Sequence, residues 1–333
     1  MTSMEFDQKI LVIRFSSIGD IVLATSAIRT IRSSYPKAQI TFLTLDEYVP
    51  LLEYHPDIDF LLSINRRSNI KELWDFSKYL GRKGFLQIFD LHNSLRSKIV
   101  TFHSNAPVYQ IRKPRLKRAM LFYLHLDQFE SEFSTRKMYH QHIGPIWNDG
   151  DPIPPTLLRL SRNEIKTSSK LLLSNGILDD FIALVPGAAW RQKQWSAQKY
   201  IDTLNQLNLP VVLIGGEKDK ICQEINEGLN TSVNLAGKTS LREAMAILVL
   251  AKNIIGSDTG LMHAAEALGK PVSMILGPTS VQTGAGVVLP QSVKIEKDLW
   301  CRPCSQNGSF PCYRKQQFCM DSIEPHNVIQ SLT

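Results

Sequence analysis

Residues 9–15 (KILVIRF) decide the fold, because this short β-branched run ends at a loop of small residues, 16–20 (SSIGD). After the loop, apolar residues recur at helical spacing, at Ile21, Ala24, Ile28 and Ile31. A β-branched run of this length is typical of a buried strand, and a spacing of three to four residues is typical of a helix. The sequence therefore opens with a strand, a loop and a helix, the first unit of an α/β fold.

The same alternation continues through the rest of the chain. In the first half we predict strands at 39–45 and 86–91, with a helix at 69–81 between them. In the second half we predict strands at 181–185, 210–214, 253–256 and 271–276, and helices at 197–207, 220–228, 240–250 and 260–268. Strands that alternate with helices predict parallel sheets. We therefore expect two Rossmann-like, doubly wound α/β domains that face each other across a cleft.

The length of the chain predicts two domains, because at roughly 150 residues per domain its 333 residues suffice for two cores. Glycine, proline and acidic residues cluster at 149–155 (DGDPIPP), which indicates a linker. Just after it, Ser161 and Glu164 form a capping-box pattern that starts a helix. We therefore expect one domain at 1–155 and a second at 156–333.

Composition excludes several classes of protein. With 43% hydrophobic and 21% charged residues the chain resembles average globular domains, so neither disorder nor a fibrous repeat explains it. Residues up to Lys9 carry acids and no apolar core, unlike a signal peptide, and no apolar stretch reaches the ~18 residues that span a bilayer. We expect a cytoplasmic protein.

Positive charge is concentrated in one part of the chain. The net charge is +7, and residues 91–126 hold seven basic residues and no acid. The basic residues are Arg96, Lys98, Arg112, Lys113, Arg115, Lys117 and Arg118. By charge alone this stretch fits a nucleic acid, an anionic membrane surface or a phosphorylated substrate, or it is only a solvated basic face.

The loop after the first predicted strand carries one carboxylate, Asp20. In open α/β sheets, ligands bind beyond the carboxyl ends of the strands, so chemistry is expected at such a loop. Asp20 is a candidate general base, and the alternative is a residue that only stabilises the helix dipole. The loop lacks the G-x-G-x-x-G fingerprint of dinucleotide-binding domains.

Two loops of the second half offer groups for a nucleotide sugar. In residues 186–195 (PGAAWRQKQW), Arg191 and Lys193 are cations suited to a diphosphate, although a loop lysine is commonly only solubilising. After the next strand, Gly215-Gly216-Glu217 places a carboxylate where it can accept hydrogen bonds from a ribose or sugar hydroxyl. The same three residues also suit an ordinary turn.

A third loop, residues 256–263 (GSDTGLMH), leads directly into a helix. Asp258 precedes this helix, and the first N–H groups of the helix, at Thr259 and Gly260, form a favourable cradle for a pyrophosphate. His263 lies about one turn into the helix, where it either supports the phosphate site or packs as a hydrogen-bonded core residue.

Four of the five cysteines fall in one short segment, at Cys301, Cys304, Cys312 and Cys319. In a reducing cytoplasm, a four-thiolate site for zinc or iron is favoured over disulfides. Four ligands would close such a site and make it structural rather than catalytic. The spacing is not that of standard zinc fingers, and free or redox-active thiols are the alternative.

Four of these sequence motifs, considered in their order along the chain, resemble those of a known family. SSIGD, PGAAWRQKQW, GGE and SDTGLMHAAEALGKP occur in the order and approximate spacing of the lipopolysaccharide heptosyltransferases, the ADP-heptose-dependent glycosyltransferase family 9, and the match spans nearly the whole chain. The chain departs from the family pattern after Gly277-Pro278-Thr279, where it reads SVQTGAG instead of a proline and a Gly-Pro pair. It also has Ser196 where the family commonly has proline.

The resemblance implies the two-domain GT-B fold, with the sugar acceptor on the first domain and the nucleotide sugar on the second. It implies an inverting transfer of heptose from ADP-heptose to a sugar hydroxyl of the lipopolysaccharide inner core, with no metal needed for transfer. The implied roles are Asp20 as the base, Lys193 with the N–H groups of Thr259 and Gly260 on the departing ADP, Glu217 on the ribose, Asp258 on the heptose hydroxyls, and His263 at the phosphates.

The resemblance also gives the basic stretch a partner, because the inner core carries carboxylates and phosphates. The residues expected to bind the acceptor are Ser17, Arg96, Lys98, Arg112 and Arg115. We expect peripheral contact with the anionic inner membrane and no nucleic-acid partner. Some members of the family have a similar cysteine finger, which resembles a structural iron or zinc knuckle.

Other functions remain open from the sequence. A nucleotide-sugar epimerase of similar fold would need no acceptor. A protein (autotransporter) heptosyltransferase would use a polypeptide acceptor, and a noncatalytic binder of sugar nucleotides or lipopolysaccharide would tolerate loss of Asp20.

Overall fold

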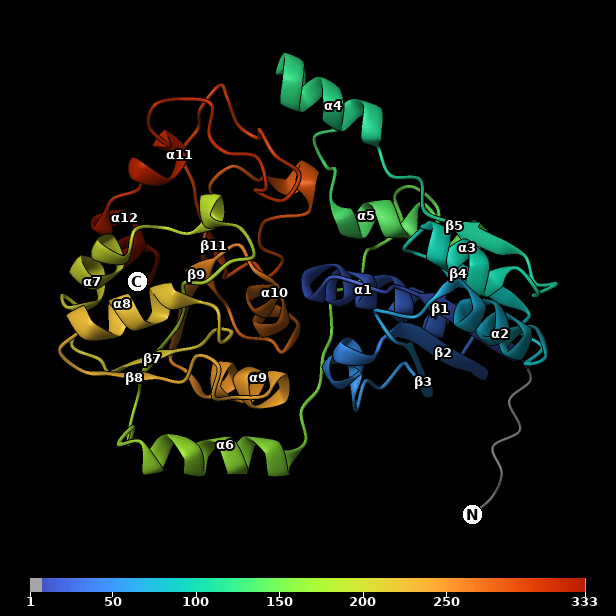
Figure 1. The fold of residues 1–333 in the computed structure, drawn as a ribbon, viewed down its shortest axis with the longest axis horizontal. Coiled ribbons are helices and arrows are strands. Elements are labelled where there is room, and N and C mark those ends of the chain that lie inside the picture. Colours follow the sequence, from blue (N-terminus) through green and yellow to red (C-terminus); the bar gives the residue numbers. More distant parts are fainter. Residues whose placement is uncertain (1–7, 333) are drawn as a thin grey trace. The chain divides into compact units, whose positions relative to one another are not determined.

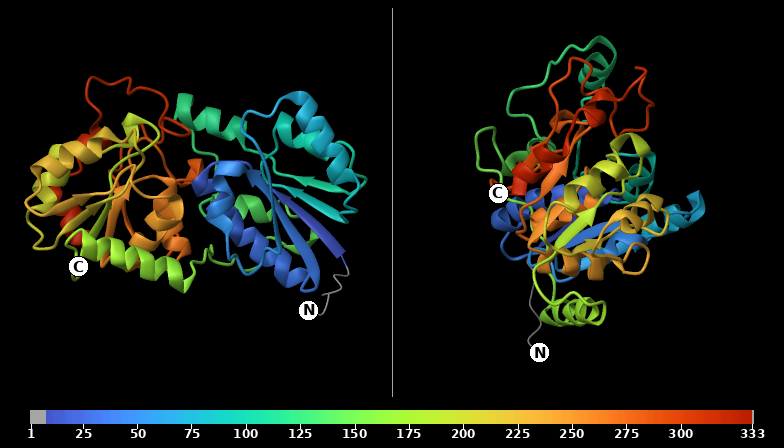
Figure 2. Two further views of the ribbon diagram at one scale, coloured as in Figure 1. Left: turned by 60° about the horizontal axis from the view of Figure 1, so that its bottom comes forward. Right: turned by 90° about the vertical axis from the view of Figure 1, so that its left-hand side faces the viewer.

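The structure is a computed structural model that describes residues 8–332 and divides the chain into two compact units (Figures 1 and 2). The first unit comprises the described residues up to Lys113 together with Thr135–Arg159. The second comprises Pro114–Ser134 and the described residues from Leu160 onward. Most of the N-terminal stretch in which the sequence predicts no signal peptide lies outside the described residues.

The first unit is built on a parallel sheet of five strands. In chain order these are β1 (Gln8–Ile13), β2 (Ala38–Leu45), β3 (Phe60–Ile64), β4 (Gln87–Asp90) and β5 (Val108–Gln110). Their order in the sheet is β3-β2-β1-β4-β5. The strand predicted first from the sequence therefore lies at the centre, and Ile10, Leu11, Val12 and Ile13 of β1 are fully buried.

Helices cover this sheet on both faces (Figure 2). They are α1 (Ile18–Ser34), α2 (Ile70–Gly81), α3 (Leu95–Thr101) and α5 (Thr135–His140), with 3₁₀ turns η1 (Asp46–Leu52) and η2 (Gly144–Ile146). Helix α1 connects β1 to β2 on one side of β1, and α2 connects β3 back across the sheet to β4 on the other side. Because such crossovers are right-handed, α1 and α2 lie on opposite faces of the sheet. Helices α2 and α3 pack side by side.

The second unit contains a parallel sheet of six strands. They are β6 (Ile182–Val185), β7 (Val211–Leu213), β8 (Ser232–Asn234), β9 (Asn253–Ser257), β10 (Ser273–Ile275) and β11 (Val293–Ile295). Their order, β11-β10-β9-β6-β7-β8, is that of a dinucleotide-binding Rossmann sheet, with the first strand in the middle.

The helices of the second unit include one that interrupts the first unit in sequence. This is α4 (Arg115–Leu124). The others are α6 (Arg162–Ser174), α7 (Ala197–Leu204), α8 (Lys220–Gly228), α9 (Leu241–Leu250), α10 (Gly260–Ala267), α11 (Phe318–Asp321) and α12 (Pro325–Ile329), with 3₁₀ turns η3 (Arg191–Lys193), η4 (Val281–Thr283) and η5 (Gln330–Leu332). Across residues 8–332 no helix combines the length and the apolar character that crossing a bilayer requires.

The expected fold class, α/β with two doubly wound parallel sheets, is confirmed. Each strand and helix predicted from the sequence is present, with ends shifted by a few residues. Strands β3, β5, β8 and β11 were not predicted from the sequence. All four are edge strands, and most of their side chains are at least partly exposed, so they carry no buried apolar run that would reveal them.

The capping box predicted at Ser161 is present at the start of α6, and a second one at Ser240 starts α9. In the first box Glu164 also receives two hydrogen bonds from the buried Arg242, at 2.6 and 2.8 Å, so this pair joins α6 to α9. These hydrogen bonds lower the pKa of Glu164 to about 2. The Glu164 carboxylate therefore stabilises the fold as well as its own helix.

We predict that Glu164→Gln lowers the free energy of unfolding by about 1–3 kcal/mol at pH 7, because it removes a charged partner of Arg242. The folded pKa lies below the ordinary value of 4.5, so this stabilisation is complete above pH 4.5 and is lost as the pH falls toward 2. Urea unfolding across this range measures it. Glu243→Gln, at the equivalent position of the second box, is the control and should cost less, because Glu243 has no hydrogen bond to an arginine among the contacts described. Equal losses would contradict the prediction.

Candidate active site

Each sheet has one point at which the strand order reverses. In the first unit it lies between β1 and β4, and in the second between β6 and β9. Crevices beyond the carboxyl ends of strands at such points are where open α/β sheets bind ligands. The predicted site residues Asp20 and Asp258 follow β1 and β9, so each lies at the switch point of its own unit.

Asp20 is held by three neighbours in the first unit. It is the third residue of α1 and closes a capping box, in which the backbone N–H and the hydroxyl of Ser17 donate to its Oδ2 at 3.2 and 3.1 Å. Arg14 Nη2 lies 2.8 Å from the same oxygen. The Tyr139 hydroxyl donates to Oδ1 at 3.4 Å, which is a long contact.

The charge state of Asp20 follows from these contacts. Burial by itself would raise the pKa of this carboxyl, but the positive charge of Arg14 and the hydrogen bonds from Ser17 outweigh burial and lower the pKa. The side chain is 38% exposed, and within the described residues the long contact with Tyr139 is the one side-chain hydrogen bond of Oδ1. Asp20 is therefore an ionised acceptor open to a further hydrogen-bond donor, and it caps its helix as well.

The loop after β4 completes this switch point, and the sequence analysis missed it. Leu91 accepts a hydrogen bond from Arg14 Nη1 at 2.7 Å, and Asp90 accepts from the backbone N–H groups of His92 and Asn93. Burial and the neighbouring charge of Arg14 lower the pKa of His92 to about 3, so its imidazole is neutral at pH 7. The residues FDLHNS at the end of β4 were the available signal, because they follow the second strand of the switch point.

The predicted acceptor residues are not gathered around Asp20. Of these residues, only Ser17 contacts it. Arg96 and Lys98 lie on α3, where Arg96 Nη2 donates to the carbonyl of Arg66 at 2.7 Å. Arg112 is exposed in the loop after β5, and Arg115 begins α4 in the second unit.

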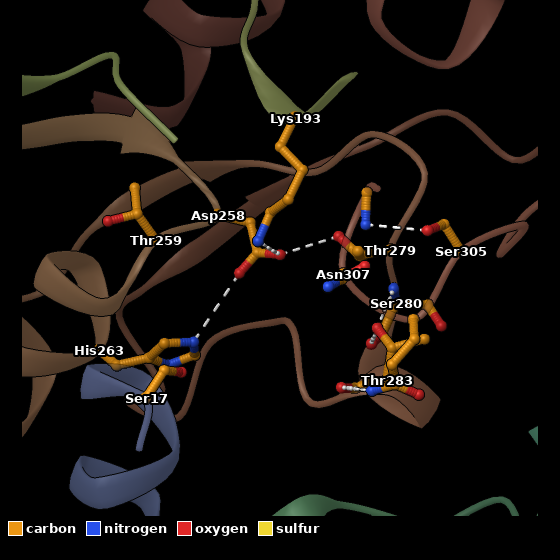
Figure 3. A network of polar contacts seen from close by, with 12 residues as sticks. Ser17, Lys193, Asp258, Thr259, His263, Thr279, Ser280, Thr283, Ser305 and Asn307 are labelled. Carbon is orange, nitrogen blue, oxygen red and sulfur yellow. Dashed lines mark hydrogen bonds and ion pairs between the residues drawn. The ribbon is translucent and has the colours of Figure 1, made fainter. Parts of the chain in front are cut away.

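In the second unit, Lys193 and Asp258 form a buried ion pair (Figure 3). Lys193 Nζ lies 2.6 Å from Asp258 Oδ2, and their side chains are 14% and 7% exposed. The Thr279 hydroxyl donates to the same oxygen at 2.8 Å. His263 Nε2 lies 3.8 Å from Oδ1. Side chains from two other loops and from α10 thus converge on the Asp258 carboxylate.

The first turn of α10 borders this network. Thr259 is the N-cap, and its side chain accepts from the N–H of Leu261 at 3.3 Å, so the helix points its N-terminal N–H groups and positive dipole end toward the Asp258 loop. His263 is 5% exposed, and its Nδ1 has no hydrogen-bond partner among the described residues. A buried ring nitrogen of this kind retains the capacity to bind a ligand atom.

Glu217 lies apart from this ion pair. It follows β7, is exposed, and has no hydrogen bond or ion pair through its carboxylate within the described chain. The sequence analysis missed its neighbour Asp219, which accepts from the N–H of Gly216 at 2.7 Å. A Cβ at Gly187 would lie 2.4 Å from the carboxyl carbon of Asp219, so only glycine allows the two loops to approach this closely.

The segment that contains the cysteines supports the ion pair. Arg302 donates to the carbonyls of Gly277 and Thr279 and pairs with Glu296, which fixes the loop after β10. Gly308 packs against Lys193, because a Cβ at this position would lie 2.6 Å from Lys193 Cγ. No sequence signal connected this segment with Lys193, since the contact joins parts of the chain that are far apart.

The four predicted metal ligands lie close enough to influence one another. Burial, followed by the charges of Cys319, Cys301 and Cys312, raises the pKa of Cys304 to about 11. The described cysteines, Cys222 included, form no disulfide. In residues 8–332, no group of three or more His, Cys, Asp or Glu side chains is arranged to hold a metal ion. The donor set suits a thiolate-bound metal, but its side chains are not converged on a common centre.

Comparison with known proteins identifies the family. Residues 73–313 match the model of glycosyltransferase family 9 (heptosyltransferase). The chain belongs to this family. It is therefore a glycosyltransferase, and the resemblance found in the sequence is confirmed.

Similar proteins match most of the chain's length. Lipopolysaccharide heptosyltransferase 2 of Escherichia coli is 28% identical over 295 residues, which are 82% of this chain and 83% of the relative. The structure of E. coli ADP-heptose lipopolysaccharide heptosyltransferase II matches with a TM-score of 0.74 at 23% identity and covers 98% of this chain and 97% of its own. The structure of TibC, an iron-containing dodecameric glycosyltransferase of enterotoxigenic E. coli, matches with a TM-score of 0.60 at 15% identity. The match covers 98% of this chain and 75% of TibC.

We predict that Gly308→Ala lowers the glycosyltransferase activity at least about tenfold, because the added methyl group displaces Lys193 from Asp258. Steady-state transfer rates measure the effect. Both Gly308 and Gly286 have positive φ angles, of 83° and 114°, but a Cβ at Gly286 would lie 4.0 Å from its nearest neighbour, Lys294 Cδ, which is an ordinary van der Waals contact. Gly286→Ala is therefore the control for backbone strain, and an equal loss in both variants would contradict the prediction.

Proposed function

We propose that this enzyme transfers heptose from ADP-heptose to a sugar hydroxyl of a lipopolysaccharide core, with inversion at the anomeric carbon. The observation that carries the proposal is the buried Lys193–Asp258 pair beside the N-terminus of α10 in a member of family 9. The names of the relatives, which include ADP-heptose and lipopolysaccharide, support the choice of donor and acceptor.

The donor would bind to the second unit. Lys193 and the N–H groups of Thr259 and Gly260 would stabilise the negative charge that develops on ADP as it departs. Asp258 would accept hydrogen bonds from the heptose hydroxyls, and the free Nδ1 of His263 would reach the phosphates. Glu217, whose carboxylate is exposed and without a polar partner in the described chain, would accept from the ribose hydroxyls.

Asp20 would act as the base on the acceptor. The acceptor oxygen attacks the anomeric carbon while the bond from that carbon to the diphosphate oxygen breaks, and the hydroxyl proton passes to Asp20. A single displacement of this kind inverts the anomeric configuration. Because Arg14 and Ser17 keep Asp20 ionised, the carboxylate is ready to accept the proton over the whole neutral range.

Anionic groups of the core would meet the basic side chains. We assign Ser17, Arg96, Lys98, Arg112 and Arg115 to acceptor binding on the basis of charge and the family resemblance. The same positive charge supports a site of action at the cytoplasmic face of the inner membrane, with peripheral contact and with no role for nucleic acid.

We propose a structural zinc or iron ion at Cys301, Cys304, Cys312 and Cys319, and no metal in the transfer step. The mutual influence of the four thiols supports this assignment, because thiolates brought together need a cation to offset their repulsion. TibC, which is described as iron-containing, shares the fold. The ion would hold the segment that supports Lys193 through Gly308.

One assay separates the candidate functions. The enzyme is incubated with ADP-heptose and a panel of truncated lipopolysaccharide cores, and the products are weighed by mass spectrometry. A core heavier by one heptose supports the proposal. A free sugar or epimer formed without acceptor would indicate an epimerase. Transfer only to a polypeptide would indicate a protein heptosyltransferase, and absence of any product would indicate a binder.

We predict that Asp20→Asn lowers kcat at least about 10²-fold and leaves the KM for ADP-heptose nearly unchanged, because it removes the base and no donor contact. Since the pKa of Asp20 is lowered, the acid limb of the wild-type pH–rate profile should lie below the ordinary value of 3.8. Lys193→Gln should instead raise the KM for the donor and lower kcat.

The controls for these variants are ion pairs elsewhere in the same units. Asp59→Asn breaks the pair with Arg32 in the first unit, and Lys252→Gln breaks the pair with Asp180 in the second. Both should retain wild-type kinetics. Near-normal turnover of Asp20→Asn, or unchanged donor kinetics of Lys193→Gln, would remove that residue from the mechanism.

For the cysteines we predict about one zinc or iron ion per chain in protein purified without chelator. Cys304→Ser should lose the metal and lower Tm, because it removes one of four ligands. Cys222→Ser is the control, since Cys222 is buried on α8 outside the segment, and it should keep the metal. Elemental analysis with thiol titration decides the question: free thiols without stoichiometric metal in the wild-type protein would show that no metal site exists.

A further inference from the structure

Two neighbouring helices of the first unit, α2 and α3, expose large apolar side chains to solvent. Leu95 is 76% exposed, Ile70 71%, Phe102 66% and Trp74 37%. Isolated exposed apolar residues are ordinary, but a contiguous group of them on a folded surface marks an interaction site. None of these four residues belongs to the catalytic or binding residues proposed above.

Helical spacing, the packing of α2 on α3 and one ring contact relate the four side chains. Ile70 and Trp74 are one turn apart on α2, and Leu95 and Phe102 are two turns apart at the two ends of α3. The two helices pack side by side (Figure 1). The ring centroids of Trp74 and Phe102 lie 4.9 Å apart. We call the surface made by Ile70, Trp74, Leu95 and Phe102 the α2–α3 face.

These helices already bury other side chains in the core. On α2 the buried residues are Leu73, Ser77 and Leu80, and on α3 they are Ser97, Val100 and Thr101. The α2–α3 face is therefore not an incompletely packed core surface. It is a second apolar surface of the same two helices.

Cations outnumber acids on these two helices and the loop before α2. Exposed or partly exposed cations lie at Arg66, Arg67, Lys71, Lys78, Arg96 and Lys98, of which Arg66 pairs with Glu47 and Lys78 with Asp75. The acids of α2 have partners: Glu72 closes the capping box with Asn69, and Asp75 pairs with Lys78. No acid occurs on α3. An apolar face within a cationic rim is complementary to an anionic lipid surface.

A second copy of this chain fits the face less well. In a symmetric dimer the same patch would meet itself, so the cations of one rim would face those of the other. A lipid headgroup layer instead offers negative charge around an apolar interior, and helices that lie in such an interface carry tryptophan, phenylalanine and leucine on their apolar face.

We propose that the α2–α3 face inserts its apolar side chains into the surface of an anionic phospholipid bilayer. The inference deepens the proposed peripheral contact and rests on it. It assigns the contact to particular residues, and it adds apolar insertion to the attraction of the basic residues. Insertion predicts binding that salt weakens but does not abolish, because screening acts on the charges and not on the buried apolar area.

The test measures cosedimentation of the protein with vesicles at about 0.1 M and about 0.5 M salt. It compares vesicles of phosphatidylcholine alone with vesicles that also contain about 30% phosphatidylglycerol. The wild-type protein should bind the anionic vesicles at low salt and retain a measurable fraction at high salt. At low salt the double variant Leu95→Ser/Phe102→Ser should bind at least about tenfold more weakly than the wild type. At high salt it should show no remaining binding.

Phe60→Ser/Leu86→Ser is the matched control, because it removes two apolar side chains of the same unit that are 51% and 48% exposed and lie outside the face. It should bind like the wild type. Lipids brominated in their acyl chains should quench the tryptophan fluorescence of the wild-type protein, and Trp74→Phe should lose that part of the quenching.

Several results would overturn the proposal. They are equal vesicle binding by Leu95→Ser/Phe102→Ser and the wild type, complete loss of wild-type binding at high salt, and unchanged quenching in Trp74→Phe. A dimer formed by the wild-type protein but not by the double variant would assign the face to a second copy instead.

Transfer to a short water-soluble core acceptor should be unchanged in the double variant. Absence of transfer in the wild-type protein would contradict the proposed function while leaving the vesicle result to decide this inference.

Discussion

The ion pair between Lys193 and Asp258 is the interaction on which the site of the second unit depends. Both side chains are largely buried, so neither charge is stable there without the other, and loss of one partner in such a pair typically costs about 3–5 kcal/mol. Thr279 adds a hydrogen bond to the same carboxylate, and the N-terminus of α10 adds a favourable field. The pair therefore holds a cation beside the N-terminus of a helix, and such termini favour anionic groups.

In the first unit, a buried cation is likewise paired with a carboxylate. Arg14 is buried and is compensated by Asp20, which also accepts hydrogen bonds from Ser17 at the start of α1. In both units a cation and a carboxylate meet at the switch point of a parallel sheet. The difference lies in exposure, because the Asp20 side chain is 38% exposed and that of Asp258 only 7%. The exposed carboxylate is open to a further hydrogen-bond donor, whereas the buried one already pairs with Lys193 and accepts from Thr279.

Distant segments complete the second site. Arg302 fixes the loop after β10 through its carbonyl oxygens, and Gly308 allows the cysteine segment to lie directly against Lys193. Glycine is required there because any side chain would occupy the volume of the lysine stem. The thiols and the ion pair therefore belong to one packed region, and an ion bound by the thiols would act on the site only through this packing.

The sequence by itself determined the α/β class, the central strands, the capping boxes and the family, because each depends on local patterns: buried β-branched runs, helical spacing, a polar residue three positions from another, and ordered motifs. It also singled out Asp20, Lys193 and Asp258. Only the tertiary structure decided that Lys193 pairs with Asp258, that Arg14 keeps Asp20 ionised, and that Gly308 packs on Lys193. Lys193 lies far from both Asp258 and Gly308 in the chain, and Arg14 reaches Asp20 only because the strand and the loop between them fold back, so no local pattern encodes these distances.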